Sequence, residues 1–176
     1  GTSEAEFNGV VGGAVNGGLG AIAITGNLDL NNTITSAASL SVSGTSNLGA
    51  NVTTTGTQTY TGAVTLSGGD RTLTGATINN LSTLAGGNKS LTITGNADVD
   101  GAITGVTNLS VAGTSNLGAD VTTTGTQTYT GAVTLSGGNR TLTGSTINNI
   151  STINGGGNSL TITGNADIDG DITNVA

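Results

Sequence analysis

The chain has 176 residues, of which 102 are Thr, Gly, Asn or Ser, and it contains no His, Cys, Pro, Met or Trp. Without His or Cys, the common zinc sites, thiol chemistry and acid–base catalysis by imidazole are excluded. Three basic residues against ten acidic ones argue against charge-driven binding to nucleic acid or an anionic membrane, and a charged fraction of only 7% favours a folded chain over a disordered one.

Residues 1–20 (GTSEAEFNGVVGGAVNGGLG) precede the regular part of the sequence. Residues 1–7 are either an added remnant or part of the natural chain. Residues 8–20 are either a linker or a cap over the N-terminal end of the fold, because the open end of a sheet needs cover.

From residue 21 onward, short runs alternate apolar and small polar residues and end in Gly. Examples are AIAITG (21–26), LSVSG (40–44), TQTYTG (57–62) and SLTITG (90–95). A period of two with β-branched residues predicts strands with one buried face. Gly and Asn at the ends of the runs suit sharp corners. Tyr60 and Tyr129 fall at inward positions and predict wider layers of the core.

An internal repeat of 69 residues dominates the chain. Segment 40–75 returns at 109–144 with three changes, segment 90–101 returns at 159–170, and a weaker copy of the latter occupies 21–32. Three short strands per coil predict an all-β fold, a parallel β-solenoid of about nine coils. Residues 21–176 form its single domain, with repeats 21–89 and 90–158 and a partial repeat 159–176. We expect about four coils per repeat, with three longer coils as the alternative.

The runs LTITGNADVDG, LSVSGTSNLGA and TYTGAVTLSGG resemble the repeat region of filamentous-haemagglutinin-type adhesins. The resemblance implies a right-handed β-helical shaft, a handedness that the crossover rule for parallel strands also favours. It further implies a large bacterial exoprotein, secreted or displayed at the cell surface, that contacts host or neighbouring cells through surface molecules such as glycans or matrix. It supplies no catalytic residues.

One acidic motif is a candidate metal site. In the alternating register Ala97 and Val99 point inward, so Asn96, Asp98 and Asp100 form an outward row with the spacing of the first half of an EF-hand calcium loop. The Glu expected at the twelfth position is missing. The row is either a solvated acidic face or a weak calcium site, and no other cofactor is expected. The repeat carries the motif again as Asn165, Asp167, Asp169 and Asp171.

Three other functions are alternatives to a structural or adhesive shaft. A calcium-stabilised or carbohydrate-binding β-helix repeat is the main alternative. A polysaccharide lyase or hydrolase would use paired carboxylates with Arg71 or Arg140, but the acidic pair is duplicated with the repeat whereas a catalytic site normally occurs once, so we predict no enzyme. Outward Thr pairs such as Thr59 and Thr61 resemble ice-binding ranks, yet Ser breaks those ranks and Thr is a common strand residue.

The same features set expectations for partners. No apolar run reaches the roughly 18 residues of a membrane span, so no span is expected. The two ends of a solenoid are open sheet edges, which predicts a tendency toward end-to-end self-association.

Overall fold

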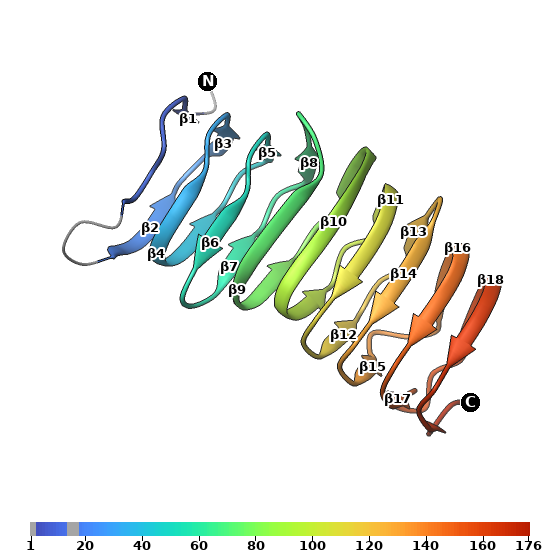
Figure 1. Ribbon diagram of the computed structural model, residues 1–176. Coiled ribbons are helices and arrows are strands. Elements are labelled where there is room, and N and C mark those ends of the chain that lie inside the picture. The colour runs from blue at the N-terminus through green and yellow to red at the C-terminus, as the bar shows by residue number, and fades with distance from the viewer. Residues whose placement is uncertain (1–2, 14–17) are drawn as a thin grey trace.

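Parallel pairing between successive turns organises the whole chain. In a computed structural model that describes residues 3–13 and 18–176, the chain winds as a parallel β-solenoid of about nine turns (Figure 1). The described residues contain no helix. The first strands are β1 (Glu4–Phe7), β2 (Leu19–Ile24), β3 (Asn27–Leu30), β4 (Ile34–Val42), β5 (Ser46–Leu48), β6 (Val52–Thr54), β7 (Gln58–Tyr60), β8 (Val64–Leu66), β9 (Arg71–Asn80) and β10 (Leu84–Val99). They are followed by β11 (Ile103–Val111), β12 (Ser115–Leu117), β13 (Val121–Thr123), β14 (Thr126–Tyr129), β15 (Val133–Leu135), β16 (Arg140–Asn149), β17 (Ile153–Asn154), β18 (Leu160–Ile168) and β19 (Ile172–Thr173).

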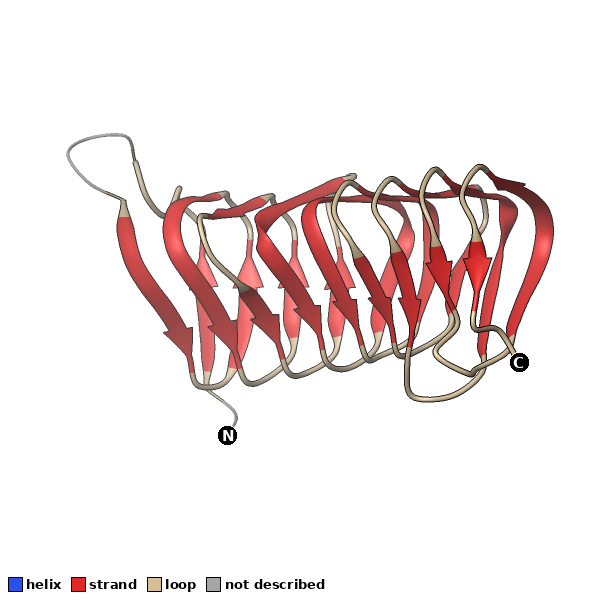
Figure 2. Ribbon diagram, turned by 90° about the horizontal axis from the view of Figure 1, so that it is seen from below, coloured by secondary structure: helices blue, strands red, loops and turns tan. Residues whose placement is uncertain are grey.

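Each turn has three strand positions, and these stack into three faces along the axis, seen from the side in Figure 2. We name each face by the inward residues that stack in it. Face A contains Ile22, Leu40, Gln58, Ile78, Ala97, Ser115, Val133, Ile153 and Ile172. Face B contains Leu28, Ser46, Val64, Leu84, Ile103, Val121, Leu142 and Ile162. Face C contains Ile34, Val52, Leu73, Ile93, Val111, Tyr129, Asn149 and Ile168.

The inward residues form one continuous, narrow core. Most are aliphatic and fully buried except in the first and last turns, which confirms the predicted alternation. Burying a Leu or Ile contributes about 1.5–3 kcal/mol, so each turn is stabilised by its neighbours rather than by its own few apolar side chains. With about 4.8 Å per turn, nine turns make a rod about 43 Å long.

Two tyrosines give the core a polar network. The Tyr60 hydroxyl donates to Gln58 Oε1 at 3.0 Å, and Gln58 Nε2 donates to the Thr74 carbonyl at 2.8 Å on the following turn. Both Tyr60 and Gln58 are at most 1% exposed. The second copy repeats these contacts at 2.9 and 2.8 Å through Tyr129, Gln127 and Thr143. Burial raises the pKa of both tyrosines. Their predicted inward position is confirmed.

Close backbone approach explains part of the high glycine content. Gly26, Gly44 and Gly62 lie one above another at the same corner of successive turns, where the Gly44 N–H donates to the Gly26 carbonyl at 2.8 Å. A Cβ atom built on Gly62 would collide with the Gly44 carbonyl oxygen. Only glycine therefore fits this corner without moving the backbone.

The 69-residue repeat does not cover a whole number of turns. Leu40 and Ala97 both lie on face A, three turns apart. Leu109, the repeat counterpart of Leu40, lies two strand positions after Ala97, in the strand of face C. One repeat thus spans three and two-thirds turns, not four or three. Residues 76–89, predicted as a coil, supply only two of the three strand positions of a turn. Each copy is consequently displaced from the previous one by one face.

The N-terminal residues also enter the stack. Strand β1 pairs in parallel with β3, and Val11 forms a bridge to Ile34. Part of the segment predicted as a remnant, linker or cap, residues 1–2 and 14–17, lies outside the described residues. Among the residues that are described, none belongs to a helix long and apolar enough to cross a membrane.

Candidate functional site

The first acidic motif lies on the outer surface of face A, at the end of β10. Asn96 and Asp100 are exposed and Asp98 is half-buried, whereas Ala97 and Val99 are buried. The alternation places them there because successive side chains of a strand point to opposite sides. The predicted outward row is therefore present.

Side chains of this row bond to the following turn. Asn96 Oδ1 accepts a hydrogen bond of 3.0 Å from the Thr114 N–H. Asp98 Oδ1 accepts one of 2.8 Å from the Asn116 side-chain amide. The side-chain oxygens of Asn96 and Asp98, which the sequence offers as metal ligands, are thus already hydrogen-bonded to the following turn.

The weaker copy of the motif makes the same two contacts. Asn27 Oδ1 accepts from the Thr45 N–H at 3.0 Å, and Asp29 Oδ1 accepts from Asn47 Nδ2 at 2.8 Å. We did not single out this pair from the sequence, although aligning NLDL (27–30) with NADV (96–99) would have found it. At these two places the spacing Asn-x-Asp therefore joins one turn to the next.

The second acidic motif occupies the C-terminal end of the rod. Asn165 and Asp167 lie in β18, opposite Thr146 and Asn148, and Asp169 and Asp171 follow this strand; all four are exposed. Because the repeat spans a fractional number of turns, Asp167 lies on face C and Asp98 on face A. The structure does not bring the two motifs together.

The surroundings of Asp98 show what a calcium ion would meet there. Within residues 3–13 and 18–176, no group of three or more Asp, Glu, His or Cys side chains is placed to hold a metal ion. Asp98 has amide neighbours, with Asn79 one turn before and Asn116 one turn after. The calcium site remains a prediction, and the oxygens that could take part are those of Asp98, Asp100 and their counterparts in the second copy.

Asn and Asp oxygens also cap the corners elsewhere. The N–H groups of Thr72 and Thr141 donate to Asn51 and Asp120 at 2.9 Å each. The Ser90 N–H donates to Asp70 Oδ1 at 2.8 Å. In the second copy, the Ser159 N–H donates to Asn139 Oδ1 at 2.9 Å. Two of the three differences between segments 40–75 and 109–144 are therefore exchanges of Asn and Asp that keep the accepting oxygen.

Arg71 and Arg140 both bond to backbone carbonyl groups at the corners. Arg71 Nε donates to the Gly69 carbonyl at 3.0 Å. Desolvation lowers the pKa of Arg71, and the charge of neighbouring Asp70 opposes this shift. Arg140 donates to the Gly138 and Gly118 carbonyls at 3.1 and 2.7 Å, and its ion pair with Asp120 is long, at 3.9 Å.

The outer rows mix several polar residue types. On face A the row reads Ser41, Thr59, Asn79, Asp98, Asn116 and Thr134. The repeat places the corresponding row on face C, as Ser110, Thr128, Asn148 and Asp167. The Thr residues considered for ice binding are thus interrupted by amides and carboxylates. The described surface contains no pocket.

Comparison with known proteins adds no relative. No protein-family model, no curated protein and no solved structure matches the chain. The class that the fold defines is a parallel β-solenoid built from an internal repeat.

Proposed function

We propose that the chain is a non-catalytic shaft segment of a large, secreted or surface-displayed bacterial adhesin-like exoprotein. The observation that carries this proposal is the unbroken stack of turns, joined at each level by backbone pairing and at many corners by Asn and Asp oxygens. A fold of this kind extends in one direction and has short corners. The likeness of its repeats to those of filamentous-haemagglutinin-type adhesins supports the same role.

The repeated polar rows are the surface that such a shaft would offer to a partner. Hydroxyl, amide and carboxylate groups on rows about 4.8 Å apart suit hydrogen bonding to glycans or matrix on a host or neighbouring cell. Because each copy is displaced by one face, the rows of successive copies point in different directions around the rod. A shaft of several copies would meet partners from every side.

Two measurements test this function. Antibodies against the chain should label intact, unpermeabilised cells of the source bacterium or its culture medium, and excess folded chain should reduce the attachment of these cells to host or neighbouring cells. Chain unfolded in urea and diluted just before use is the matched control and should not compete. Labelling confined to permeabilised cells, or release of sugar products from a polysaccharide panel, would overturn the proposal.

A further inference from the structure

Six successive turns of face C carry an outer surface that differs from the mixed rows described above. Their inward residues are Ile34, Val52, Leu73, Ile93, Val111 and Tyr129. The residues on either side of each inward residue point outward, because successive side chains of a strand alternate. Nine of these twelve outward residues are Thr, and we call them the Thr array: Thr33, Thr35, Thr53, Thr72, Thr74, Thr92, Thr94, Thr128 and Thr130. The other three are Asn51, Ser110 and Ala112.

The register between turns brings Thr residues from both copies of the repeat into this array. Thr74 pairs with Thr53 on one neighbouring turn and with Thr94 on the other. Thr128 also lies on face C, although its counterpart in the first copy, Thr59, lies on face A. The displacement of each copy by one face therefore extends the array along face C.

The hydroxyl groups of the Thr array are available to water. In the part of the chain that the structure describes, four Thr side chains donate hydrogen bonds to backbone carbonyls, and all four lie outside the array: Thr54, Thr55, Thr123 and Thr173. Every member of the array is exposed or half-buried. Because a β-branched side chain is stiff, its hydroxyl and methyl groups are held at nearly fixed positions on the sheet.

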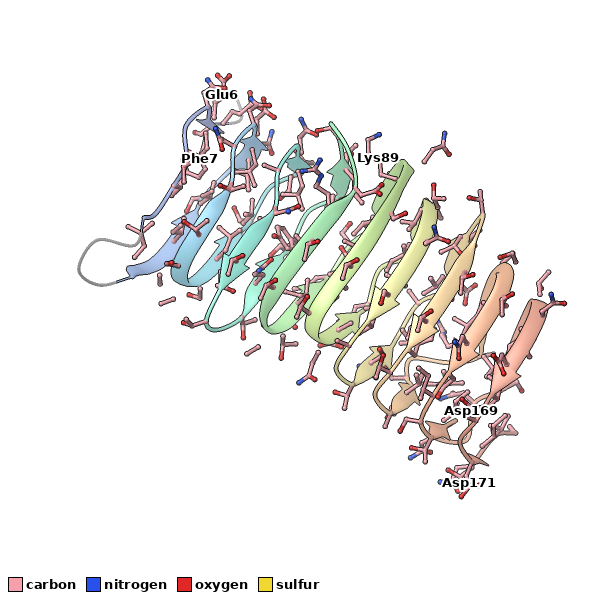
Figure 3. The ribbon with its side chains drawn as sticks, viewed as in Figure 1. Glu6, Phe7, Lys89, Asp169 and Asp171 are labelled. Carbon is pink, nitrogen blue, oxygen red and sulfur yellow. The ribbon has the colours of Figure 1, made fainter. Side chains whose placement is uncertain are left out.

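No charged residue interrupts the array, although the chain has ten acidic and three basic residues. Arg71 and Lys89 lie at the corners that lead into face C, and Figure 3 shows Lys89 at the edge of the rod. Beyond Thr128 the same row continues as Asn148 and Asp167, so the array ends there. The surface between these limits is neutral in an otherwise acidic protein.

The spacing of the array matches a crystalline lattice of water. Residues two positions apart on one strand are about 6.6 Å apart, and successive turns are about 4.8 Å apart. Both spacings are within about a tenth of the repeats of the oxygen lattice on the prism plane of hexagonal ice, and six turns extend the match over about 24 Å. Ice carries no charge, so a neutral, hydroxyl-bearing sheet can bind it without desolvating a carboxylate, which would be costly. We propose that the Thr array of face C binds ice.

Growth of a single ice crystal in a solution of the folded chain tests the proposal. Held just below its melting point, the crystal should become faceted, and it should resist growth until the temperature falls to a lower freezing point. The gap between melting and freezing should widen as the protein concentration rises. Rounded crystals and no gap at any soluble concentration would refute ice binding. The attachment of cells proposed above is measured above freezing, so either function can fail without the other.

A matched pair of variants locates the binding surface. Thr74→Tyr places a bulky ring in the middle of the array, where it would hold ice away from the other hydroxyls, and should remove most of the freezing gap. Thr143→Tyr makes the same change in the same local sequence, RTLTG, but on face B, and should leave the gap unchanged. Both positions are half-buried and have a turn on either side. Tyr is a common strand residue, and circular dichroism verifies that each variant is folded. Equal gaps in the two variants, or a loss confined to Thr143→Tyr, would overturn the assignment to face C.

Discussion

Raising the pH above about 10 is expected to weaken the fold through its two tyrosines. Burial raises the pKa of Tyr60 and Tyr129, so the folded chain holds the phenolic protons more tightly than the unfolded chain, where the pKa of Tyr is about 10. The stabilising contribution is complete below about pH 10 and is lost as the pH rises toward the folded-state pKa, because the unfolded chain then releases protons first.

The expected loss is large enough to measure. Where the folded state keeps a proton that the unfolded state has released, the free energy of unfolding falls by about 1.4 kcal/mol per pH unit. At about pH 11 this amounts to about 1.4 kcal/mol for each tyrosine and about 2.8 kcal/mol for the pair. Both side chains are 1% exposed, so solvent screening does not reduce this value. The whole free energy of unfolding of a typical domain is only about 5–15 kcal/mol.

Urea unfolding at about pH 9 and about pH 11 measures this loss. The control is the double variant Tyr60→Phe/Tyr129→Phe, which keeps Lys89 and both arginines but lacks the phenols. Its urea midpoint should change less with pH, and each single variant should remove about half of the effect. The reasoning would be refuted if ultraviolet absorbance showed the native tyrosines ionising near pH 10 while the urea midpoint stayed constant.

Other substitutions probe the corners and the acidic row. Gly62→Ala should lower the free energy of unfolding by about 2 kcal/mol or more, whereas Gly69→Ala, near which only the tip of an arginine lies, should change it by about 0.5 kcal/mol or less; equal effects would contradict the close approach. Asn96→Ala should cost about 1 kcal/mol and Asn96→Asp little, because Asp keeps the accepting oxygen; equal losses would show that the capping bond is not what stabilises. A shaft should melt at the same temperature in EDTA and in excess calcium. A calcium-dependent rise in melting temperature that Asp98→Ala plus Asp167→Ala abolishes would instead establish the metal site.

The sequence predicted the inward residues well because alternation is a local property of a strand. Leu40, Val42 and Tyr60 are buried as expected, since neighbouring side chains must point to opposite sides. What alternation cannot show is which atoms meet across turns. The bond from Gln58 Nε2 to the Thr74 carbonyl joins residues 16 apart, and it depends on how the chain bends between them.

The number of turns per repeat was not readable for a similar reason. Corners differ in length: the inward Leu73 comes seven positions after Leu66, but Val52 comes only four positions after Leu48. Strand β10 bends through corners without interruption from Leu84 to Val99, so no break in the pattern marks its change of face. Only the pairing partners reveal where a turn closes. The acidic row was located correctly, yet its bonds to the following turn depend on the same register.

The fractional number of turns per repeat has a consequence for how such a rod changes through evolution. Inserting or deleting one 69-residue copy keeps every corner and every stacked pair intact, because the new copy enters at the next strand position. It advances whatever follows by about 18 Å along the axis and rotates it by a third of a turn. The number of copies therefore sets both the distance along the axis and the orientation about the axis of any segment that follows. Only a change of three copies restores the original orientation.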